Sequence, residues 1–447
     1  MSTTVIKNAL IINEGKQFAG DLVLKNGRIE QIGSNVNIKE NHSEIDASGL
    51  HVLPGDIDDQ VHFREPGLTH KANIYTEAKA AVAGGVTSFM EMPNTFPPAF
   101  TESLLEDKYA IGAQTSLANF SFYMGTSNDN IEEILKINKR KNEICGVKIF
   151  MGSSTGNLLV DNALTLEKVF SGSELLIATH CEEERIIAEN LAKRLLEKPV
   201  LDITDHPIIR NAEVCFESSF KAVQLAKKHN SRLHVLHITT EKELQLFGNM
   251  IPLSDKRITC EVCVHHLHFT ADDYAQYGNL IKCNPAIKAP SNKEAIWKAL
   301  LDDRIDVIAT DHAPHTWEEK NEPYSKAHAG LPLIQHPLLL MLHYVKERRI
   351  SVEKVVEKMS HAVADCFQIK ERGYIREGYF ADLVLVNMQQ PHTVTKSNLH
   401  YKCGWSPLEG FTFPATIVQT FVNGNVVYGN GVFNESIKGM RLAFNRS

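Results

Sequence analysis

The feature that most constrains this chain is a regular alternation between apolar segments of strand length and segments with helical periodicity. The apolar segments lie at residues 51–63, 85–94, 119–127, 146–153, 175–182, 232–239, 258–266 and 306–315. Between most of them, segments such as 73–85 and 183–198 repeat apolar residues with the period of a helix. Parallel strands covered by helices are nearly continuous in apolar residues. The alternation therefore predicts an α/β protein with a closed (β/α)8 barrel of the TIM type, spanning about residues 51–365.

An open, doubly wound sheet is the alternative with the same types of element. Such a sheet has a topological switch point and usually carries a glycine-rich phosphate loop. No G-x-G-x-x-G sequence occurs in this chain, which favours the barrel.

Both chain ends have the pattern of short antiparallel strands. The segment DLVLKNGRIEQIG, residues 21–33, places Asn-Gly between two strand-like runs, which is a strong hairpin signal. Near the other end, residues 381–390 and 420–433 repeat the pattern. Two β-rich ends that flank a different middle predict one small β-sandwich domain, built from residues 1–52 and 366–447.

Composition excludes several classes of function. The net charge of -7 and the absence of a Lys/Arg stripe argue against a nucleic-acid partner. No apolar run is long enough for a membrane span, and the first residues, MSTTVIKNAL, lack the apolar stretch of a signal peptide, so we expect a cytoplasmic protein. The cysteines lie in apolar segments, as expected for reduced, packed thiols. The C-x-x-C pair of Cys260 and Cys263 is interpreted in the same way, with the two thiols on opposite faces of a strand.

Polar side chains follow almost every apolar segment, at the point where each strand is expected to end. They are His62, Arg64, Asn94, Lys148, His180, His237, His265, His266, Asp311 and His315. Catalytic residues of a TIM barrel lie at the C-terminal ends of its strands. We therefore expect these side chains to converge on one pocket.

Each of these residues alone has a purely structural explanation. A single histidine is more often a hydrogen-bonded core residue than a ligand, Lys148 can extend to solvent from a strand end, and Asp311 can cap a turn. Together, several histidines, an aspartate and a lysine at the strand ends of one barrel would bury many polar groups without partners. A metal ion supplies that partner, and these nitrogen and oxygen ligands suit Zn²⁺ or a neighbouring first-row metal.

Short motifs along most of the chain carry a family resemblance. They are DDQVHFREPG, EMPNT, GVKIFMGSSTGN, ATHCE, VLHITT, VHHLHFT, KCNPAIK, IATDHAPH and KCGWSPLEGF. In these motifs the chain resembles the amidohydrolase superfamily, and within it the dihydroorotases and their hydantoinase and allantoinase relatives. FREPG, MPNT and KCGWSP resemble the dihydroorotases in particular.

The resemblance implies a role for each matching residue. His62 would bind the more buried of two metal ions, a carboxylated Lys148 would bridge both, and His180 and His237 would bind the second. Asp311 would bind a metal and act as the general base. The residues that hold the substrate would be Arg64, Asn94, Asn284 and His315. The implied reaction is the reversible hydrolysis of dihydroorotate to N-carbamoyl-aspartate in pyrimidine biosynthesis, with one or two Zn²⁺ ions as cofactor.

The chemistry of the residues agrees with these roles. A lysine amine reacts with carbon dioxide only when it is neutral, and burial in the apolar strand GVKIF is expected to lower the pKa of Lys148. The resulting carbamate is an anion, so metal binding and carboxylation stabilise each other. Asp311 can accept a proton and pass it to the leaving nitrogen. The guanidinium fork of Arg64 suits a carboxylate on the substrate.

Three positions depart from the family pattern. Gln60 stands where a first histidine ligand is expected, Lys288 replaces the usual arginine after the Asn-Pro element, and residues 329–336 read AGLPLIQH in place of Gly-x-Pro-Gly-x-Glu. A glutamine oxygen is a weaker ligand for zinc than an imidazole nitrogen. We therefore expect the metal that faces Gln60 to be held weakly. The structural alternative is a Gln60 that bonds to water or to Asp58.

Two other functions compete with dihydroorotate hydrolysis. A hydantoinase or allantoinase would share the chemistry, but a neutral ring gives a buried Arg64 no partner. A catalytically silent scaffold, which serves as an assembly partner, would explain the loss of the first histidine. It would not explain why the other ligand positions keep their residues. A homodimer is compatible with the sequence, which leaves the oligomeric state open.

Overall fold

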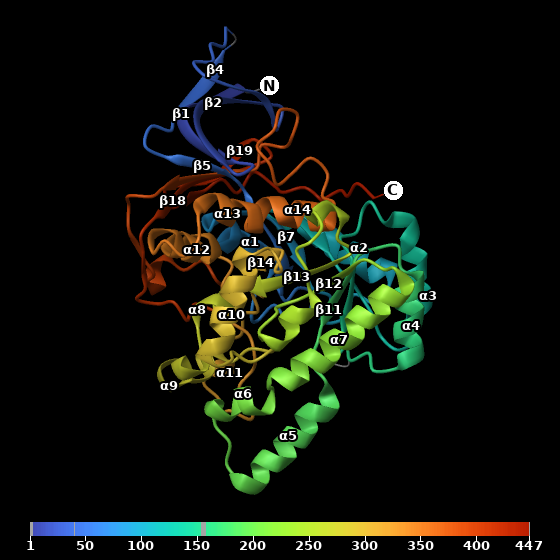
Figure 1. The fold of residues 1–447 in the computed structure, drawn as a ribbon. Coiled ribbons are helices and arrows are strands. Elements are labelled where there is room, and N and C mark those ends of the chain that lie inside the picture. Colours follow the sequence, from blue (N-terminus) through green and yellow to red (C-terminus); the bar gives the residue numbers. More distant parts are fainter. Residues whose placement is uncertain (1–2, 40, 153–157, 447) are drawn as a thin grey trace.

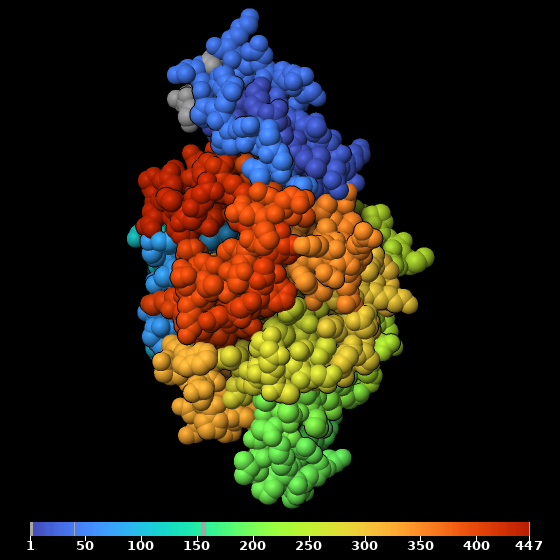
Figure 2. All heavy atoms as spheres, turned by 90° about the vertical axis from the view of Figure 1, so that its left-hand side faces the viewer, coloured from blue at the N-terminus to red at the C-terminus, as the bar shows by residue number. Residues whose placement is uncertain are grey.

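The two ends of the chain lie in one nine-stranded sheet of the computed structural model, which describes residues 3–39, 41–152 and 158–446. Its strands are β1 (Thr3–Asn13), β2 (Lys16–Lys25), β3 (Arg28–Gly33), β4 (His42–Asp46), β5 (His51–Pro54), β15 (Leu383–Asn387), β18 (Thr416–Val422), β19 (Asn425–Gly429) and β20 (Val432–Phe433). The order is β20-β19-β18-β15-β5-β1-β2-β3, and β4 pairs with β1. The ends meet where β5 pairs antiparallel with β15, with Leu53 opposite Val384. Figure 2 shows the N-terminal strands, in blue, beside the C-terminal ones, in red.

Two Asn-Gly turns form the predicted hairpins of this sheet. Asn26 and Gly27 join β2 to β3, and Asn423 and Gly424 join β18 to β19, all four with positive φ. The two turns also pack against each other, since a Cβ atom on Gly424 would lie 2.9 Å from the Gly27 Cα. Glycine is therefore required at this contact for space as well as for backbone conformation.

The middle of the chain forms the barrel (Figure 1). Its strands are β6 (Asp56–Val61), β7 (Val86–Glu91), β8 (Asn119–Phe122) with its continuation β9 (Met124–Gly125), β10 (Val147–Phe150), β11 (Ile177–His180), β12 (Leu233–Val235), β13 (Ile258–Cys263) and β14 (Val307–Ala309). They pair in parallel in the orders β6-β7-β8 and β14-β13-β12-β11-β10-β9. The His62 amide donates to the His312 carbonyl at 2.7 Å, which links the first strand to the segment after the last.

Helices surround the barrel. They are α1 (Ile74–Ala83), α2 (Glu102–Thr115), α3 (Ile131–Lys136), α4 (Ala163–Gly172), α5 (Glu184–Glu197), α6 (His206–Ile209), α7 (Ala212–His229), α8 (Val264–His268), α9 (Tyr274–Tyr277), α10 (Pro290–Leu301), α11 (Trp317–Lys320), α12 (Pro337–Lys346), α13 (Val352–Val356) and α14 (Ala362–Phe367). Side-chain caps begin several of them, such as the capping box of Asn73 and Thr76 at α1. Helix α5 projects at the end of the molecule opposite the nine-stranded sheet (Figures 1 and 2). None of the helices in the described ranges is long and apolar enough to cross a membrane.

The predicted fold class is confirmed, with two local differences. The apolar segment 51–63 divides at Gly55 into β5 of the nine-stranded sheet and β6 of the barrel, and a Cβ atom at Gly55 would lie 2.2 Å from Thr87 Oγ1. The segment 258–266 leaves the strand at Cys263, so His265 and His266 lie on the short helix α8. The end of the motif GVKIFMGSSTGN, residues 153–157, lies outside the described residues.

Candidate active site

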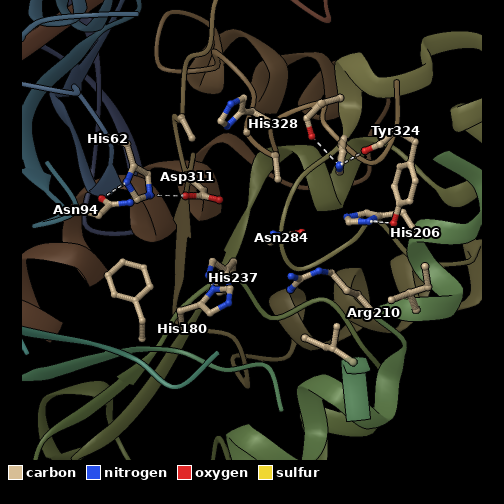
Figure 3. Close-up of a pocket in the computed structure, with 18 of the residues that line it drawn as sticks. His62, Asn94, His180, His206, Arg210, His237, Asn284, Asp311, Tyr324 and His328 are labelled. Carbon is tan, nitrogen blue, oxygen red and sulfur yellow. Dashed lines mark hydrogen bonds and ion pairs between the residues drawn. The ribbon is translucent and has the colours of Figure 1, made fainter. Parts of the chain in front are cut away.

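A cavity of about 510 Å³ lies at the C-terminal ends of the barrel strands (Figure 3). The predicted site residues that line it are His62, Arg64, Asn94, Lys148, His180, His237, Asn284 and Asp311. Gln60 lines the cavity as well. His315 contacts the lining residue Arg64, whose Nη2 lies 3.1 Å from His315 Nε2. The structure thus brings together side chains that follow different strands, while their chemical roles stay predictions.

His62 lies between Asn94 and Asp311. Its Nδ1 is 2.7 Å from Asn94 Oδ1, and its Nε2 is 3.1 Å from Asp311 Oδ1 (Figure 3). Burial acts to raise the pKa of Asp311, but the hydrogen bond and the charge of His62 outweigh it, so the pKa lies below its usual range. Asp311 is therefore a carboxylate at neutral pH, positioned to accept a proton or to bind a cation.

Gln60 occupies the position expected for a histidine ligand. Its Nε2 donates to Asp311 Oδ1 at 3.1 Å, and its Oε1 accepts the Cys263 thiol at 3.6 Å. Its backbone amide, not its side chain, bonds to Asp58. The amide side chain therefore holds the same carboxylate oxygen as His62.

Lys148 lies on β10 with its side chain almost completely buried. Burial lowers the pKa of its amine to about 7, although the charges of Asp311 and Glu261 act against this shift. The amine lies 4.6 Å from the centre of the Phe150 ring. A large fraction of the amine is therefore neutral near pH 7, the form that reacts with carbon dioxide.

His180 and His237 are neighbours in the cavity wall. His180 Nδ1 is 3.0 Å from His237 Nε2. His180 Nε2 lies 3.2 Å from Glu182 Oε2 without hydrogen-bond geometry, and His237 Nδ1 has no hydrogen-bond partner among the described residues. Burial, followed by the neighbouring His180, lowers the pKa of His237 well below its usual value. The pair therefore offers one imidazole nitrogen, His237 Nδ1, that lacks a partner among the described residues.

Arg64 forms the other side of the cavity. Its Nε donates to the Pro314 carbonyl at 3.1 Å, and burial lowers its pKa to about 10. No carboxylate among the described residues lies within ion-pair distance of Arg64. Asn284 Oδ1 is likewise buried without a partner in the described part of the chain. A guanidinium without a carboxylate partner and an amide oxygen without a donor are suited to bind a polar, anionic ligand.

The donor set in this cavity fits a divalent metal ion of the zinc type. His62, His180 and His237 supply imidazole nitrogens, and Asp311 and a carboxylated Lys148 would supply oxygens. The unpartnered Nδ1 of His237 is the observation that supports this fit, because buried polar atoms in proteins almost always have a partner.

Two groups of three residues with closely spaced donor atoms were not predicted to bind a metal. In the described part of the chain, donor atoms within 4.8 Å of one another occur in Cys263 with His265 and His266, and in Asp59 with His234 and Glu261. The sequence predicts the two histidines of the first cluster at a strand end and its cysteine in the core. The second cluster was missed, although the H-x-x-H spacing of HVLH pointed to His234.

The cluster of Asp59, His234 and Glu261 is fully buried beneath the cavity. His234 Nε2 lies 3.3 Å from Asp59 Oδ2 and 3.2 Å from Glu261 Oε2. Burial acts to lower the pKa of His234, but the two carboxylates outweigh it and raise the pKa to about 10. Glu261 also accepts the backbone amide of His237 at 3.2 Å. This cluster therefore supports the backbone of a predicted ligand.

Several residues at the cavity mouth were also missed. Arg210 forms an ion pair with Glu182. His206 Nδ1 lies 3.0 Å from the Tyr324 hydroxyl (Figure 3). Lys282 donates to the carbonyls of Tyr324 and Ala327, both at 2.6 Å. These residues lie on a short helix and on loops, where no periodic pattern marks them.

Comparison with known proteins gives consistent matches. The model of the amidohydrolase family matches residues 51–427. The chain is 31% identical to a dihydroorotase of Methanothermobacter thermautotrophicus over 91% of this chain and 90% of that protein. It is 28% identical to an allantoinase of Deinococcus radiodurans over 98% of both. Among solved structures, the L-hydantoinase (dihydropyrimidinase) of Arthrobacter aurescens has a TM-score of 0.90 with 26% identity, covering 97% of each chain.

Proposed function

Because the chain belongs to the amidohydrolase family and is a hydrolase of cyclic amides, we propose that its substrate is dihydroorotate. Hydrolysis of that ring gives N-carbamoyl-aspartate, and the reverse reaction serves pyrimidine biosynthesis. The observation that carries the proposal is Arg64, a buried guanidinium at the cavity wall with no carboxylate partner among the described residues. A ring that bears a carboxylate supplies the missing partner.

The substrate carboxylate would lie against Arg64, with Asn284 and His315 beside it. The His315 ring is held by Lys71, whose amine is 3.1 Å from His315 Nδ1, and by the Ala329 carbonyl, 3.0 Å from Nε2. A bidentate guanidinium and a fixed imidazole ring would orient the cyclic substrate, so that its amide carbonyl faces Asp311.

Metal binding is proposed for the other side of the cavity. His62 and Asp311 would hold one Zn²⁺, His180 and His237 a second, and carboxylated Lys148 both. A bound ion of this kind lowers the pKa of water and polarises a carbonyl. Carboxylation of the Lys148 amine releases one proton and forms an anion, which the cations would neutralise.

Asp311 is proposed as the general base. It is ionised at neutral pH, so it can take the proton from the attacking water. It would then pass this proton to the ring nitrogen as the amide bond breaks. His62 and Gln60 both contact Asp311 Oδ1 and restrict the direction in which the carboxylate faces.

The alternative functions differ from dihydroorotate hydrolysis in whether they give Arg64 a carboxylate partner. Hydantoin and allantoin rings carry no carboxylate, so either would leave the buried guanidinium unpaired. A silent scaffold would not need the predicted ligands to line one cavity.

The test is a hydrolysis assay on dihydroorotate, hydantoin and allantoin with the parent protein, Arg64→Met and Arg64→Lys. We expect the parent to prefer dihydroorotate and Arg64→Met to weaken its binding by about 2 to 5 kcal/mol. Arg64→Lys should recover only part of this loss, because it keeps the charge without the fork. An unchanged KM in Arg64→Met, or a preference for hydantoin or allantoin, would contradict the proposal.

A further inference from the structure

The end of β13 carries a thiol and two imidazoles that the proposed reaction does not use. Cys263 is the last residue of the strand, and His265 and His266 follow on α8. All three side chains are buried, and one donor atom from each lies within 4.8 Å of the others. The three residues are called the β13 cluster below.

The two imidazoles of the β13 cluster have ring nitrogens whose lone pairs are available to a metal ion. Nδ1 of His266 is buried without a hydrogen-bond partner in the described ranges, and the buried ring of His265 makes at most a weak contact with the backbone of Thr310. His266 Nε2 lies 3.2 Å from the Pro285 carbonyl, which can only accept, so Nε2 carries the proton and Nδ1 keeps its lone pair. Burial lowers the pKa of His265 to about 4 and that of His266 well below its usual value, so both rings are neutral near pH 7.

The thiol of the β13 cluster contrasts with its neighbour on the same strand. Cys260 Sγ donates to the Arg304 carbonyl at 3.4 Å on the other face of β13. Within the described part of the chain, the hydrogen-bond partner of the Cys263 thiol is Gln60 Oε1, at 3.6 Å. Gln60 Oε1 thus lies beside the β13 cluster as a neutral oxygen donor.

We propose that Cys263, His265 and His266 bind one additional metal ion of the zinc type, with Gln60 Oε1 as the neighbouring oxygen donor. One thiolate, two imidazoles and one oxygen form a four-donor set of the kind that zinc binds. Binding releases the Cys263 thiol proton to solvent and replaces it with the metal. The ion would give a partner to one ring nitrogen of His265 and to His266 Nδ1.

This site would also fix the orientation of Gln60. With its oxygen turned toward the β13 cluster, the Gln60 amide nitrogen faces Asp311, which it contacts at 3.1 Å. The Gln60 side chain would then connect the β13 cluster, through Oε1, with the predicted catalytic site, through Nε2 and Asp311. The inference does not rest on the identity of the substrate.

Cobalt substitution tests the proposal in the whole protein. The parent, Lys148→Ala, Cys263→Ser and Cys260→Ser would each be stripped, loaded with Co²⁺ alone, and examined by near-ultraviolet absorption and metal analysis. We expect a thiolate-to-cobalt charge-transfer band in the parent, in Lys148→Ala and in Cys260→Ser. Cys263→Ser should lose the band and about one ion per chain.

Lys148→Ala separates this site from the catalytic one, whose donors are nitrogen and oxygen only. A parent protein without the band, or a band that survives Cys263→Ser, would overturn the proposal. If Cys263→Ser does not fold, X-ray absorption of the zinc-loaded parent and Lys148→Ala still decides. A sulfur neighbour at about 2.3 Å in both proteins supports the site, and its absence from both overturns it.

Discussion

The two sides of the predicted catalytic metal site differ in how far the protein satisfies its own donor atoms. On the side of Gln60, both His62 and Gln60 contact the same oxygen of Asp311. On the other side, His237 Nδ1 has no partner among the described residues. A metal entering the Gln60 side must replace the hydrogen bonds of His62 and Gln60 to Asp311. A metal entering the other side replaces the single contact between His180 and His237, where His237 Nδ1 has no partner among the described residues. We therefore expect the side of His180 and His237 to bind its metal more tightly.

Lys148→Ala should have the largest effect, because the lysine is predicted to serve both sides equally. Turnover should be abolished and metal lost from both sides, since the carbamate that would bridge them is absent. Short carboxylic acids in the medium should restore part of both by replacing the carbamate. Metal analysis and the hydrolysis assay measure this.

Lys320→Ala is the matched control for that experiment. Lys320 is also fully buried, with a pKa lowered to about 7 by burial, but its amine donates to three backbone carbonyls. It should keep the metal content of the parent. If Lys148→Ala also binds metal like the parent, Lys148 is not a ligand.

Asp311→Asn should lower kcat by about 10²- to 10⁴-fold, because it removes the proton acceptor while keeping shape and volume. Thermal unfolding of this variant should stay close to that of the parent. Activity within tenfold of the parent would exclude Asp311 as the base.

Gln60→His, made in the Cys263→Ser background so that no ion at the β13 cluster is counted, sharpens the comparison because it changes one side of the catalytic site only. Retention of metal on that side should rise by about ten- to a hundredfold, the range typical of changes around a metal ligand. Dialysis against a chelator, followed by metal analysis, measures the difference. With Gln60 in place, the catalytic site should hold between about one and two ions per chain. This number is measured in Cys263→Ser, which lacks the ion proposed at the β13 cluster. If two ions per chain remain in Cys263→Ser after dialysis against a chelator, Gln60 does not weaken metal binding.

The smallest effect concerns pH. The Lys148 amine is lowered to a pKa of about 7, so the neutral, reactive form increases as pH rises through that value. Recovery of activity after removal of metal and carbamate, with Zn²⁺ added back at a fixed concentration of dissolved carbon dioxide, should quicken by about tenfold per pH unit below 7 and level off above it. A recovery rate that keeps rising to pH 10 would mean that the amine has an ordinary pKa.

The sequence predicted the barrel and the residues at its strand ends well. Burial on both faces makes parallel strands apolar, so the first polar residues after each strand, such as Lys148 and His180, mark one end of the barrel. These positions depend only on local pattern and on the topology that the pattern implies.

Contacts between residues that are distant in the chain could not be predicted in this way. The sequence identified Gln60 as unusual but could not show that it meets Asp311 and Cys263, which lie more than 200 residues away. His206 and Arg210 reach the cavity from a segment without strand or long-helix periodicity. Their position depends on how loops pack, which no short pattern encodes.

The sheet built from both chain ends has a consequence for synthesis on the ribosome. Strand β5 ends at Pro54, but its partner β15 begins only at Leu383. At about 5 to 20 residues per second, β5 waits on the order of 20 to 60 s for this neighbour, with one edge unpaired. An open strand edge invites pairing with other chains, so the nascent protein depends on transient protection of that edge, and a chain that stops before β15 leaves it permanently exposed.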